Sequence, residues 1–567
     1  AVSRVDGVIF MDTADSKVVV KLLPSMADIA FLMPVVFLFG RMDGLITLLG
    51  DCDTGWHIRT GQWILAHHAV PYRDLFSYSK PNSVWYAWEW LADVIFAGLN
   101  RAGGLAAVSL FAVLLLAVIF TLVFRLARRH SNPVVAVAVT VLAVGASSIH
   151  WLARPHLFTL LFTVIFLNAL YRVKEGRTRF AGIPWLVLLP VLTVLWTNLH
   201  GGFLVGVSMI AAFGAAELLQ ILLAAQGEGR AAGLDRAKKY FLSALACLAA
   251  SLLNPYTYHL HVHVLRYLRD PYQAEHIMEF LSVSFHHPIA IFFETMLAGG
   301  VLAGAWYARQ GSFVEPLLLL LWAHAALLSA RNIPLFMIVA APMVAAVAAA
   351  GLRHLPTAPV AAWLQQAAVR FNRVVRETSE TDAIGRWHLA SVAGVALVVA
   401  LLYAPHPPKG FRAEFDPQRY PAGAVSALGQ YPAARVFTFD QWGDYLIYRL
   451  YPRSKVFVDG RSDFYGDDFE TKLLAVLNVN YGWDQTLARF GVDTVLMPPN
   501  SPLTGALKES SRWQVVYDDG VALVFRAHGQ ALGDRASAGI AGGSGRDREV
   551  TKTPTSDQPI TELGSKT

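Results

Sequence analysis

Residues 103–124 read GGLAAVSLFAVLLLAVIFTLVF, a run without one charged side chain. At the helical rise of about 1.5 Å per residue, a stretch of this length crosses the roughly 30 Å hydrocarbon core of a bilayer. Arg125 follows it directly. The stretch therefore predicts a membrane-spanning helix and a fold built from such helices.

The composition of the whole chain agrees with this interpretation. Of 567 residues, 55% are hydrophobic and 16% are charged, and the mean hydropathy is +0.43. Soluble domains carry about 25% charged residues, so a soluble enzyme and a disordered chain are both excluded as classes. Cys52 and Cys247 are too few for a disulfide framework.

Ten more apolar stretches resemble the first and bring the expected number of membrane helices to about eleven. The eleven stretches are residues 26–48, 103–124, 133–150, 156–171, 183–198, 202–225, 240–253, 289–307, 313–330, 333–352 and 388–404. They predict an α-helical polytopic membrane domain over residues 25–404, preceded by a cytoplasmic segment over residues 1–24.

Charge in the loops predicts the orientation. With the N-terminus inside, the inner segments hold twenty Lys and Arg and the outer loops hold seven. Cytoplasmic loops are enriched in positive charge, so we expect the N-terminus inside, an odd number of helices and the C-terminus outside. The net charge of +6 is thereby explained by orientation, and it does not indicate a nucleic-acid partner.

The first outer loop, residues 49–89, begins with a pair of carboxylates. Asp51 and Asp53 stand two residues apart just outside the first helix, and His57 follows four residues later. Such a pair can hold a divalent cation, or one member can act as a general base. The alternative is a solvated turn. Residues 58–68 then predict a short amphipathic helix in the plane of the membrane interface.

Two further outer junctions carry polar residues between apolar helices. Arg154 and His156 lie where almost no loop separates two helices. An arginine there needs a partner, either a phosphate or an acidic residue, unless it extends to the interface. Asn198 and His200 precede a Gly-Gly return and are expected to point into the cavity that this return lines.

The fourth outer region, about 254–288, is rich in histidine. His259 and His263 have the i, i+4 spacing of metal ligands on a helix. No H-E-x-x-H motif is present, so contact with a lipid phosphate is the other interpretation. Within the apolar stretches, Glu294 is a functional candidate because ionisable groups are costly there, and His324 is expected to be a hydrogen-bonded core residue.

Composition changes after residue 404. Residues 405–528 alternate expected strands with helices, which predicts an extracytoplasmic α/β domain. The expected strands are residues 435–439, 455–459, 494–497, 513–517 and 521–525, and the expected helices are 441–451, 467–479 and 483–491. Residues 529–567 are rich in Gly, Ser and Thr and are expected to be disordered.

These features together resemble the GT-C glycosyltransferase superfamily. The resemblance rests on Asp51 and Asp53 in the first outer loop, on the predicted orientation and on the soluble domain after the last helix. The stretch Trp442-Gly443-Asp444-Tyr445 is distantly similar to the W-W-D-Y-G motif of oligosaccharyltransferase catalytic subunits. The patterns D-x-D-x-x-W-H, R-P-H, N-x-H-G-G-F and L-N-P-Y also resemble a group of uncharacterised bacterial membrane proteins.

The resemblance implies transfer of a sugar from a polyprenyl-phosphate donor to a glycan, lipid or protein acceptor, in a bacterial cytoplasmic (inner) membrane. It places Asp51 as general base, Asp53 as helper, and both as candidate ligands of Mg²⁺ or Mn²⁺, with His57 beside them. For the donor phosphate it offers Arg154, His156, His200 and Arg331. For the substrate cavity it offers Glu89, Asn198, His259, Glu279, Trp442 and Asp444.

Two other classes remain open at this point. A transporter or flippase for a lipid-linked or anionic substrate would use Glu294 and His324 along its path. No inverted repeat supports it, and the polar residues gather on one face. A non-catalytic structural subunit of an envelope complex could retain the same fold.

Overall fold

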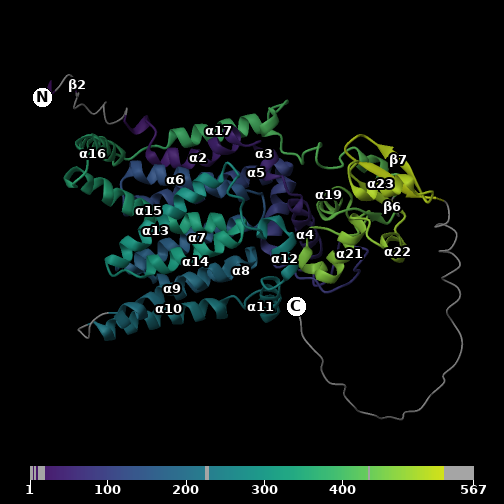
Figure 1. The fold of residues 1–567 in the computed structure, drawn as a ribbon, viewed down its shortest axis with the longest axis horizontal. Helices are drawn as coiled ribbons and strands as arrows, with labels where there is room; N and C mark the ends of the chain where they lie inside the picture. The colour runs from purple at the N-terminus through teal and green to yellow at the C-terminus, as the bar shows by residue number, and fades with distance from the viewer. Residues whose placement is uncertain (1–3, 6–7, 10–19, 224–228, 432–433, 529–567) are drawn as a thin grey trace, which may run out of the picture.

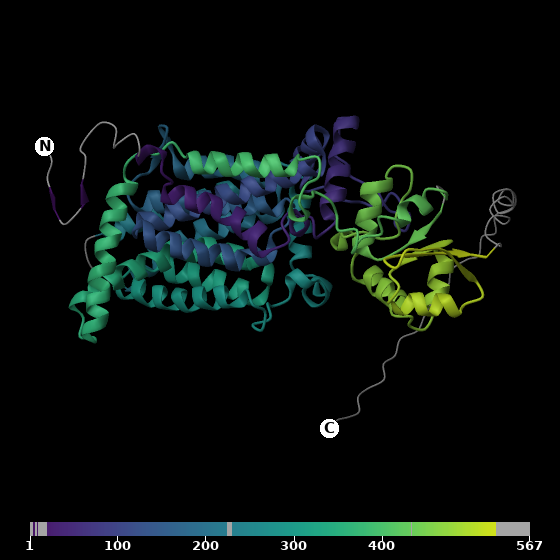
Figure 2. The ribbon, with the colours of Figure 1, turned by 90° about the horizontal axis from the view of Figure 1, so that it is seen from above.

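The computed structural model describes residues 4–5, 8–9, 20–223, 229–431 and 434–528. The expected disorder of residues 529–567 and most of the N-terminal segment therefore lie outside the described residues. A long helical bundle forms one end of the molecule, and a mixed region of helices and strands forms the other (Figures 1 and 2).

Each of the eleven predicted apolar stretches contains a helix, and the first is divided between α2 (Met26–Arg41) and the short α3 (Leu45–Leu48). The bundle helices are α2 (Met26–Arg41), α5 (Trp90–Arg129), α6 (Pro133–Ser147), α7 (His156–Lys174), α8 (Trp185–Leu199), α9 (Leu204–Leu223), α10 (Arg230–Ala250), α13 (Ala290–Arg309), α14 (Val314–Leu328), α15 (Ile333–His354) and α17 (Leu389–Leu402). Among the described residues, seven helices are long and apolar enough to cross a membrane, and α8, α14 and α17 are shorter apolar helices. The protein is thus a polytopic helical membrane protein, and the full count of eleven spans stays a prediction.

Helix α5 shows why the predicted span begins at residue 103. It has 40 residues, about twice what a bilayer core needs at about 1.5 Å per residue. Gly103 and Gly104 depart from helical geometry, and Gly104 has a φ of 64°. Glycine adopts this left-handed conformation without a steric penalty, so the helix kinks where the apolar run starts.

Short elements cover the bundle end that faces the C-terminal region. They are α3 (Leu45–Leu48), α4 (Asp53–His67), η1 (Ser148–His150), η2 (Gly201–Phe203), α11 (Tyr258–Tyr267), α12 (Pro271–His276), η3 (Met278–Phe280) and η4 (Ala330–Asn332). Elsewhere the chain forms β1 (Arg4–Val5), β2 (Val8–Ile9), β3 (Arg179–Phe180), β4 (Ile183–Pro184), η5 (Leu355–Thr357) and α16 (Ala362–Asp382).

Helix α4 differs from the interfacial helix expected over residues 58–68. It begins at Asp53, and most of its first nine residues are buried. It packs against α5 because Gly61 lies so close to the backbone carbonyl of Asp93 that a Cβ would not fit there. The acidic pair is therefore a helix start held inside the protein and not a solvated turn.

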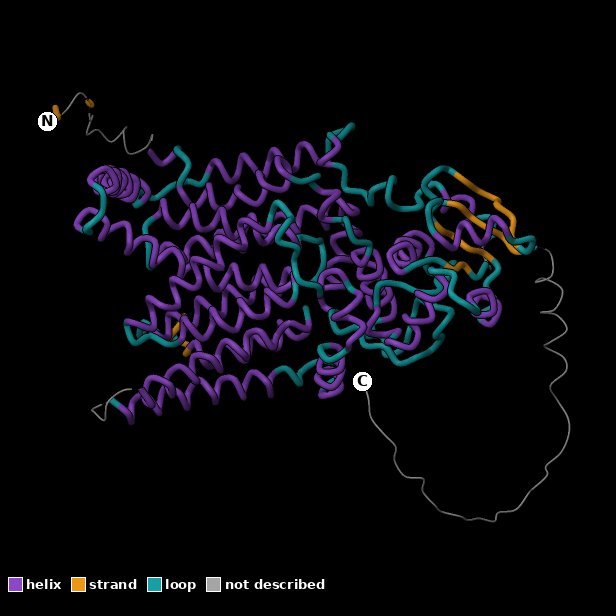
Figure 3. The backbone as a smooth tube through the Cα atoms, in the orientation of Figure 1, coloured by secondary structure: helices purple, strands orange, loops and turns teal. Residues whose placement is uncertain are grey.

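The C-terminal region contains a four-stranded mixed sheet of order β5-β6-β8-β7, drawn in orange in Figure 3. Its strands are β5 (Val436–Phe437), β6 (Thr494–Met497), β7 (Trp513–Asp518) and β8 (Leu523–Ala527). β5 and β6 are parallel, and the other neighbours are antiparallel. Around them lie η6 (Lys409–Phe411), α18 (Ala424–Leu428), α19 (Asp440–Leu450), α20 (Ser462–Tyr465), α21 (Asp467–Leu477), α22 (Trp483–Arg489) and α23 (Pro502–Glu509).

The prediction of a strand over residues 455–459 is wrong, because these residues form an irregular segment with isolated bridges at Val456. Only Val456 pairs in sheet fashion, in parallel bridges with Val436 on one side and Ser77 on the other. Its N–H donates to the carbonyl of Phe76 at 3.0 Å, and its carbonyl accepts from Tyr78 at 2.9 Å. The first outer loop thus extends the sheet, and the loop and the C-terminal region share one hydrogen-bonded layer.

Candidate functional site

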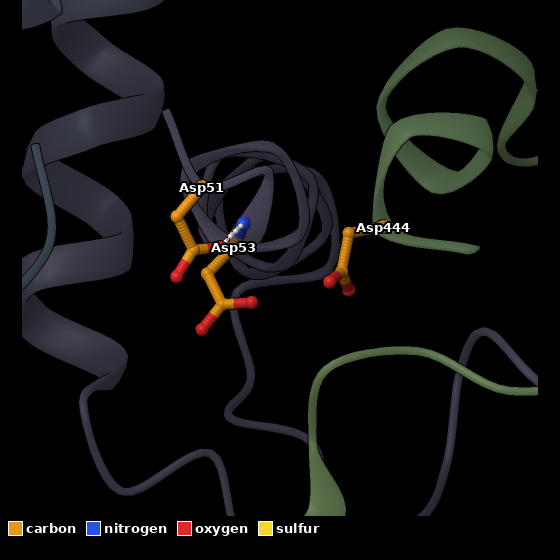
Figure 4. Close-up of side chains that lie close together, drawn as sticks. All are labelled: Asp51, Asp53 and Asp444. Atoms are coloured by element: carbon orange, nitrogen blue, oxygen red, sulfur yellow. Dashed lines mark hydrogen bonds between the residues drawn. The ribbon is translucent and has the colours of Figure 1, made fainter. Parts of the chain in front are cut away.

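Three carboxylates meet where α4 begins beside α19. Asp51 and Asp53 come from the start of α4, and Asp444 points toward them from α19 (Figure 4). One oxygen of each lies within 4.8 Å of the others. The N–H of Asp53 donates to Asp51 Oδ1 at 2.9 Å, which fixes the turn that presents the pair.

Glycines let α19 approach both α4 and the segment around Val458. A Cβ on Gly55 of α4 would lie 2.7 Å from Cβ of Tyr448 on α19, and a Cβ on Gly443 would clash with the carbonyl of Val458. Larger residues at these positions would push α19 away. Gly55 on α4 thus allows α19 to bring Asp444 to the acidic pair, and Gly443 allows α19 to pack on the segment before Gly460.

Two oxygens of this group have no hydrogen-bond partner. Asp53 Oδ1 and Asp444 Oδ2 are buried and unpartnered among the described residues. Both face Gly460, where a Cβ would lie 2.6 Å from Asp444 Oδ2 and would clash with Asp53 Oδ1. The Gly460 N–H donates to Asp444 Oδ1 at 2.9 Å. Buried carboxylate oxygens without partners are costly, so this arrangement suits a bound cation or a shared proton.

Burial raises the pKa of both Asp53 and Asp444 well above the ordinary value for aspartate. For Asp53 the facing guanidinium of Arg154 opposes this shift, and Asp51 adds to it. For Asp444 the negative charge of Asp53 adds to the shift. A carboxyl group with a raised pKa is a stronger base than an ordinary one, as a general base near neutral pH requires.

Arg154 joins the acidic pair. Its two terminal nitrogens lie 2.7 Å from Asp51 Oδ2 and 2.7 Å from Asp53 Oδ2. Burial alone would lower its pKa, but the facing carboxylates raise it well above the ordinary value. The partner that the sequence demanded for this arginine is therefore the acidic pair.

A second ion-pair group borders the first. Glu279 lies 3.2 Å from Arg331, 3.5 Å from Arg154 and 3.7 Å from His150. Burial alone would raise its pKa, but Arg331 and Arg154 lower the pKa of Glu279 to about 2. Asp51, Asp53 and Glu279 thus face Arg154 and Arg331 at this end of the bundle.

His57 and Glu89 belong to a third group. His57 Nδ1 lies 2.6 Å from Asp93 Oδ1, and His57 Nε2 lies 3.6 Å from Glu89 Oε2. Glu89 Oε1 faces His200 Nε2 at 3.3 Å. Burial raises the pKa of Glu89 to about 8 and lowers the pKa of His57 well below its ordinary value. His57 therefore interacts with Asp93 and Glu89, and among the described residues it makes no hydrogen bond to Asp51 or Asp53.

Four predicted site residues have structural partners. His156 Nε2 contacts the His150 carbonyl at 3.1 Å, and His200 Nδ1 contacts the Thr159 hydroxyl at 2.7 Å. Asn198 accepts a hydrogen bond from Trp90 at 2.7 Å. Trp442 donates to the Arg419 carbonyl at 2.9 Å. These contacts position the helices and occupy the polar atoms concerned.

His259 does not join the cluster. It is exposed and stacks on Tyr258, whereas His263 pairs with Asp463 of the C-terminal region at 2.9 Å. The structure thus gives the i, i+4 histidine pair two separate surroundings. Glu294 and His324 are both exposed on the outside of the bundle. The expectation that His324 is a core residue is wrong, because its helix α14 turns that face outward.

Sequence reasoning missed Asp93, His150 as a partner of Glu279, and Gly460. Asp93 gave a signal, since it is an acidic residue in the apolar pattern of α5. Gly460 gave no such signal in the sequence, because its close approach to Asp53 and Asp444 depends on contacts between segments that are distant in the chain.

Comparisons with known proteins place the fold. No family model and no curated protein matches the sequence. The archaeal oligosaccharyltransferase AglB from Archaeoglobus fulgidus, in complex with an inhibitory peptide and a dolichol-phosphate, is similar with a TM-score of 0.50. The identity is 12%, and the match covers 83% of this chain and 69% of that one.

Two further solved structures are also similar. The oligosaccharyltransferase of Archaeoglobus fulgidus in complex with Zn and sulfate has a TM-score of 0.48 at 14% identity, over 84% of this chain and 68% of that one. ArnT from Cupriavidus metallidurans in the apo state has a TM-score of 0.46 at 16% identity, over 90% and 98%. With a TM-score of 0.50, the match to AglB shows a fold similar to that of GT-C glycosyltransferases over most of this chain.

Proposed function

We propose that the protein transfers a sugar from a polyprenyl-phosphate-linked donor to an extracytoplasmic glycan, lipid or protein acceptor. The observation that carries the proposal is the meeting of Asp51, Asp53 and Asp444 with two buried, unpartnered oxygens. The fold supports it, since the chain is similar to an oligosaccharyltransferase solved with a dolichol-phosphate.

In this proposal the acidic residues act on the acceptor. Asp53 and Asp444 have raised pKa values, so either can take the proton that the acceptor loses as it attacks the sugar carbon. Arg154 holds Asp51 and Asp53 in place and keeps its guanidinium close to the leaving phosphate. Arg331, paired with Glu279, contributes a second positive charge to that phosphate.

The three carboxylates also fit a divalent cation such as Mg²⁺ or Mn²⁺. Hard cations prefer carboxylate oxygens as ligands. Asp53 Oδ1 and Asp444 Oδ2 have no hydrogen-bond partner among the described residues and could therefore ligate the cation. When bound, such a cation would neutralise part of the acidic charge and attract the donor phosphate.

The transporter alternative loses its support. Glu294 and His324 were the residues proposed for its path, and both are exposed on the outside of the bundle. The buried ionisable groups gather instead at the bundle end beside α4 and α19.

The test is consumption of polyprenyl-phosphate hexoses by the purified protein in proteoliposomes, measured as release of polyprenyl phosphate. We expect Asp53→Asn and Asp444→Asn each to lose at least about 100-fold in rate, or about 2.7 kcal/mol of transition-state stabilisation. Gly460→Ala keeps every carboxylate but crowds their free oxygens, and we expect a similar loss. The control Asp43→Asn alters an exposed carboxylate and should retain the rate.

Rates equal to wild type in the Asn variants would refute the catalytic role. Accumulation of the lipid-linked sugar inside vesicles without release of polyprenyl phosphate would support a transporter instead.

A further inference from the structure

A cavity lies outside the acidic cluster, between the first outer loop and α20–α22. Its volume is about 400 Å³, within the range of small-ligand sites, about 300–1,000 Å³. Three cations line it, namely Lys80, Lys472 and Arg489, against one carboxylate, Asp468. The cavity therefore favours a negatively charged ligand.

The cations are available to a ligand. Lys472 and Arg489 are exposed, and within the described part of the chain no ion pair joins either of them to a carboxylate. Lys80 donates to the carbonyls of Phe464 and Tyr465 at 2.8 and 2.9 Å. An ammonium group has three hydrogens, so one remains for a ligand.

Aromatic rings form the apolar part of the same wall. Tyr465, Phe469 and Phe490 line the cavity. Their rings pack on one another, with centroids 4.9 Å apart for Tyr465 and Phe469 and 6.1 Å apart for Phe469 and Phe490. The rings are tilted to one another, by 30° for Tyr465 and Phe469 and by 75° for Phe469 and Phe490. Such an apolar aromatic surface beside cations suits a sugar ring, whose C–H face is apolar and whose substituents carry the charge.

The cavity is connected to the acidic cluster through a short chain of contacts. The Tyr465 hydroxyl donates to Asp459 Oδ2 at 2.8 Å. Asp459 immediately precedes Gly460, whose N–H donates to Asp444 at 2.9 Å. Tyr465 thus links the cavity wall to the segment that positions Asp444.

From this geometry we infer that the cavity is a binding site for an acidic saccharide, a glycan whose sugars carry carboxylate or phosphate groups. Lys80, Lys472 and Arg489 bind the anionic groups, and the aromatic wall takes a sugar ring. The inference goes beyond the proposed transfer reaction, because binding here uses none of the three catalytic carboxylates.

The experiment measures binding of defined probes to the full-length protein in nanodiscs by calorimetry. The probes are an oligogalacturonate, a neutral maltooligosaccharide of equal length and an oligoglutamate peptide of equal charge. We expect the oligogalacturonate to bind at least about 10-fold more tightly than the other two, with an affinity that falls as salt rises. The variant Lys472→Gln/Arg489→Gln should weaken this binding at least about 10-fold.

The matched control is Arg453→Gln/Lys508→Gln, which removes two exposed cations of the same region outside the cavity and should bind as wild type does. If the neutral maltooligosaccharide binds as tightly as the oligogalacturonate, the site does not require a charged ligand. If the oligoglutamate peptide binds as tightly, the site does not require a saccharide. Either result overturns the inference. Absence of binding, or unchanged affinity in the cavity variant, overturns the site. Release of polyprenyl phosphate from the polyprenyl-phosphate hexose is assayed in parallel. A protein that releases polyprenyl phosphate but does not bind the oligogalacturonate contradicts the saccharide site and leaves the proposed transfer reaction intact.

Discussion

Glu89 shows how a single buried side chain can carry a pH dependence. It stands between His57 and His200, and burial raises its pKa to about 8. Its neutral form fits both neighbours. His200 Nδ1 accepts from the Gly202 N–H, which leaves the proton on Nε2, facing Glu89 Oε1. The other Glu89 oxygen can then carry a proton toward His57 Nε2.

We predict that Glu89 makes the protein less stable as the pH rises. A carboxyl group with a pKa of about 8 when folded and about 4.3 when unfolded binds more protons in the folded state between those values. Its contribution is thus fully present below the unfolded value and is lost as the pH rises to about 8, at about 1.4 kcal/mol per pKa unit.

Glu89→Gln keeps an acceptor and a donor but cannot ionise. The difference in Tm between this variant and wild type should therefore shift in favour of the variant as the pH rises from 5 to 8. Thermal unfolding in detergent across that range measures it, with the exposed Glu414→Gln as the control. A Tm difference that does not change with pH would contradict the assignment.

Arg461 joins two elements that are distant in the sequence. It lies 2.8 Å from Asp74 of the first outer loop and 2.7 Å from Asp459. Its guanidinium also lies 4.5 Å from the ring centroid of Trp85. All of these groups are buried. Together with the bridge between Ser77 and Val456, this contact fixes the loop to the sheet.

We predict that Arg461→Leu destabilises the protein by about 3–5 kcal/mol, because it leaves the buried Asp74 and Asp459 without their cation. The first outer loop should then be cut faster by protease, and the Tm should fall. Arg453→Leu changes an exposed arginine of the same region and should alter the Tm little. Equal protease resistance of the Arg461 variant and wild type would show that the loop is held by other contacts.

The elements also show what sequence could and could not predict. The apolar runs predicted the bundle helices because helix formation in lipid depends on local composition. The expected strands 513–517 and 521–525 correspond to the antiparallel pair β7 and β8, because the residues between them, Asp518-Asp519-Gly520, are a local turn signal. The strand predicted over residues 455–459 was wrong because the pairing of Val456 depends on Ser77, almost 380 positions away. Such a distant contact leaves no periodic pattern in the sequence.

The same distinction holds for the site. Asp51 and Asp53 were recognisable because their spacing is local. Asp444 was named for its motif, but only the packing of α19 on α4 shows that it belongs with them. Arg154 was predicted to need a partner on energetic grounds, and the partner is now identified. His259 was placed with the cavity residues on spacing alone, although its side chain is exposed.

In the whole molecule, the basic segments and the proposed catalytic carboxylates lie at opposite ends of the helical bundle. The basic segments that predict a cytoplasmic side include residues 172–179, at the end of α7 and in the connection to α8. The acidic cluster lies at the opposite end, next to the C-terminal region (Figure 1). A lipid-linked donor exposed on the outer face would reach Asp53 only if that end faces outward. The proposed reaction therefore depends on the predicted orientation, N-terminus inside and C-terminal region outside.

Cysteine labelling in intact cells tests this orientation. Cys52 and Cys247 are both buried, so wild type should give little background with a membrane-impermeant maleimide. We expect Lys508→Cys, exposed in α23, to be labelled in intact cells, and Arg177→Cys, exposed after α7, to be labelled only after permeabilisation. The reverse pattern would place the acidic cluster in the cytoplasm, where an extracytoplasmic acceptor cannot reach it, and would refute the reaction proposed for this site.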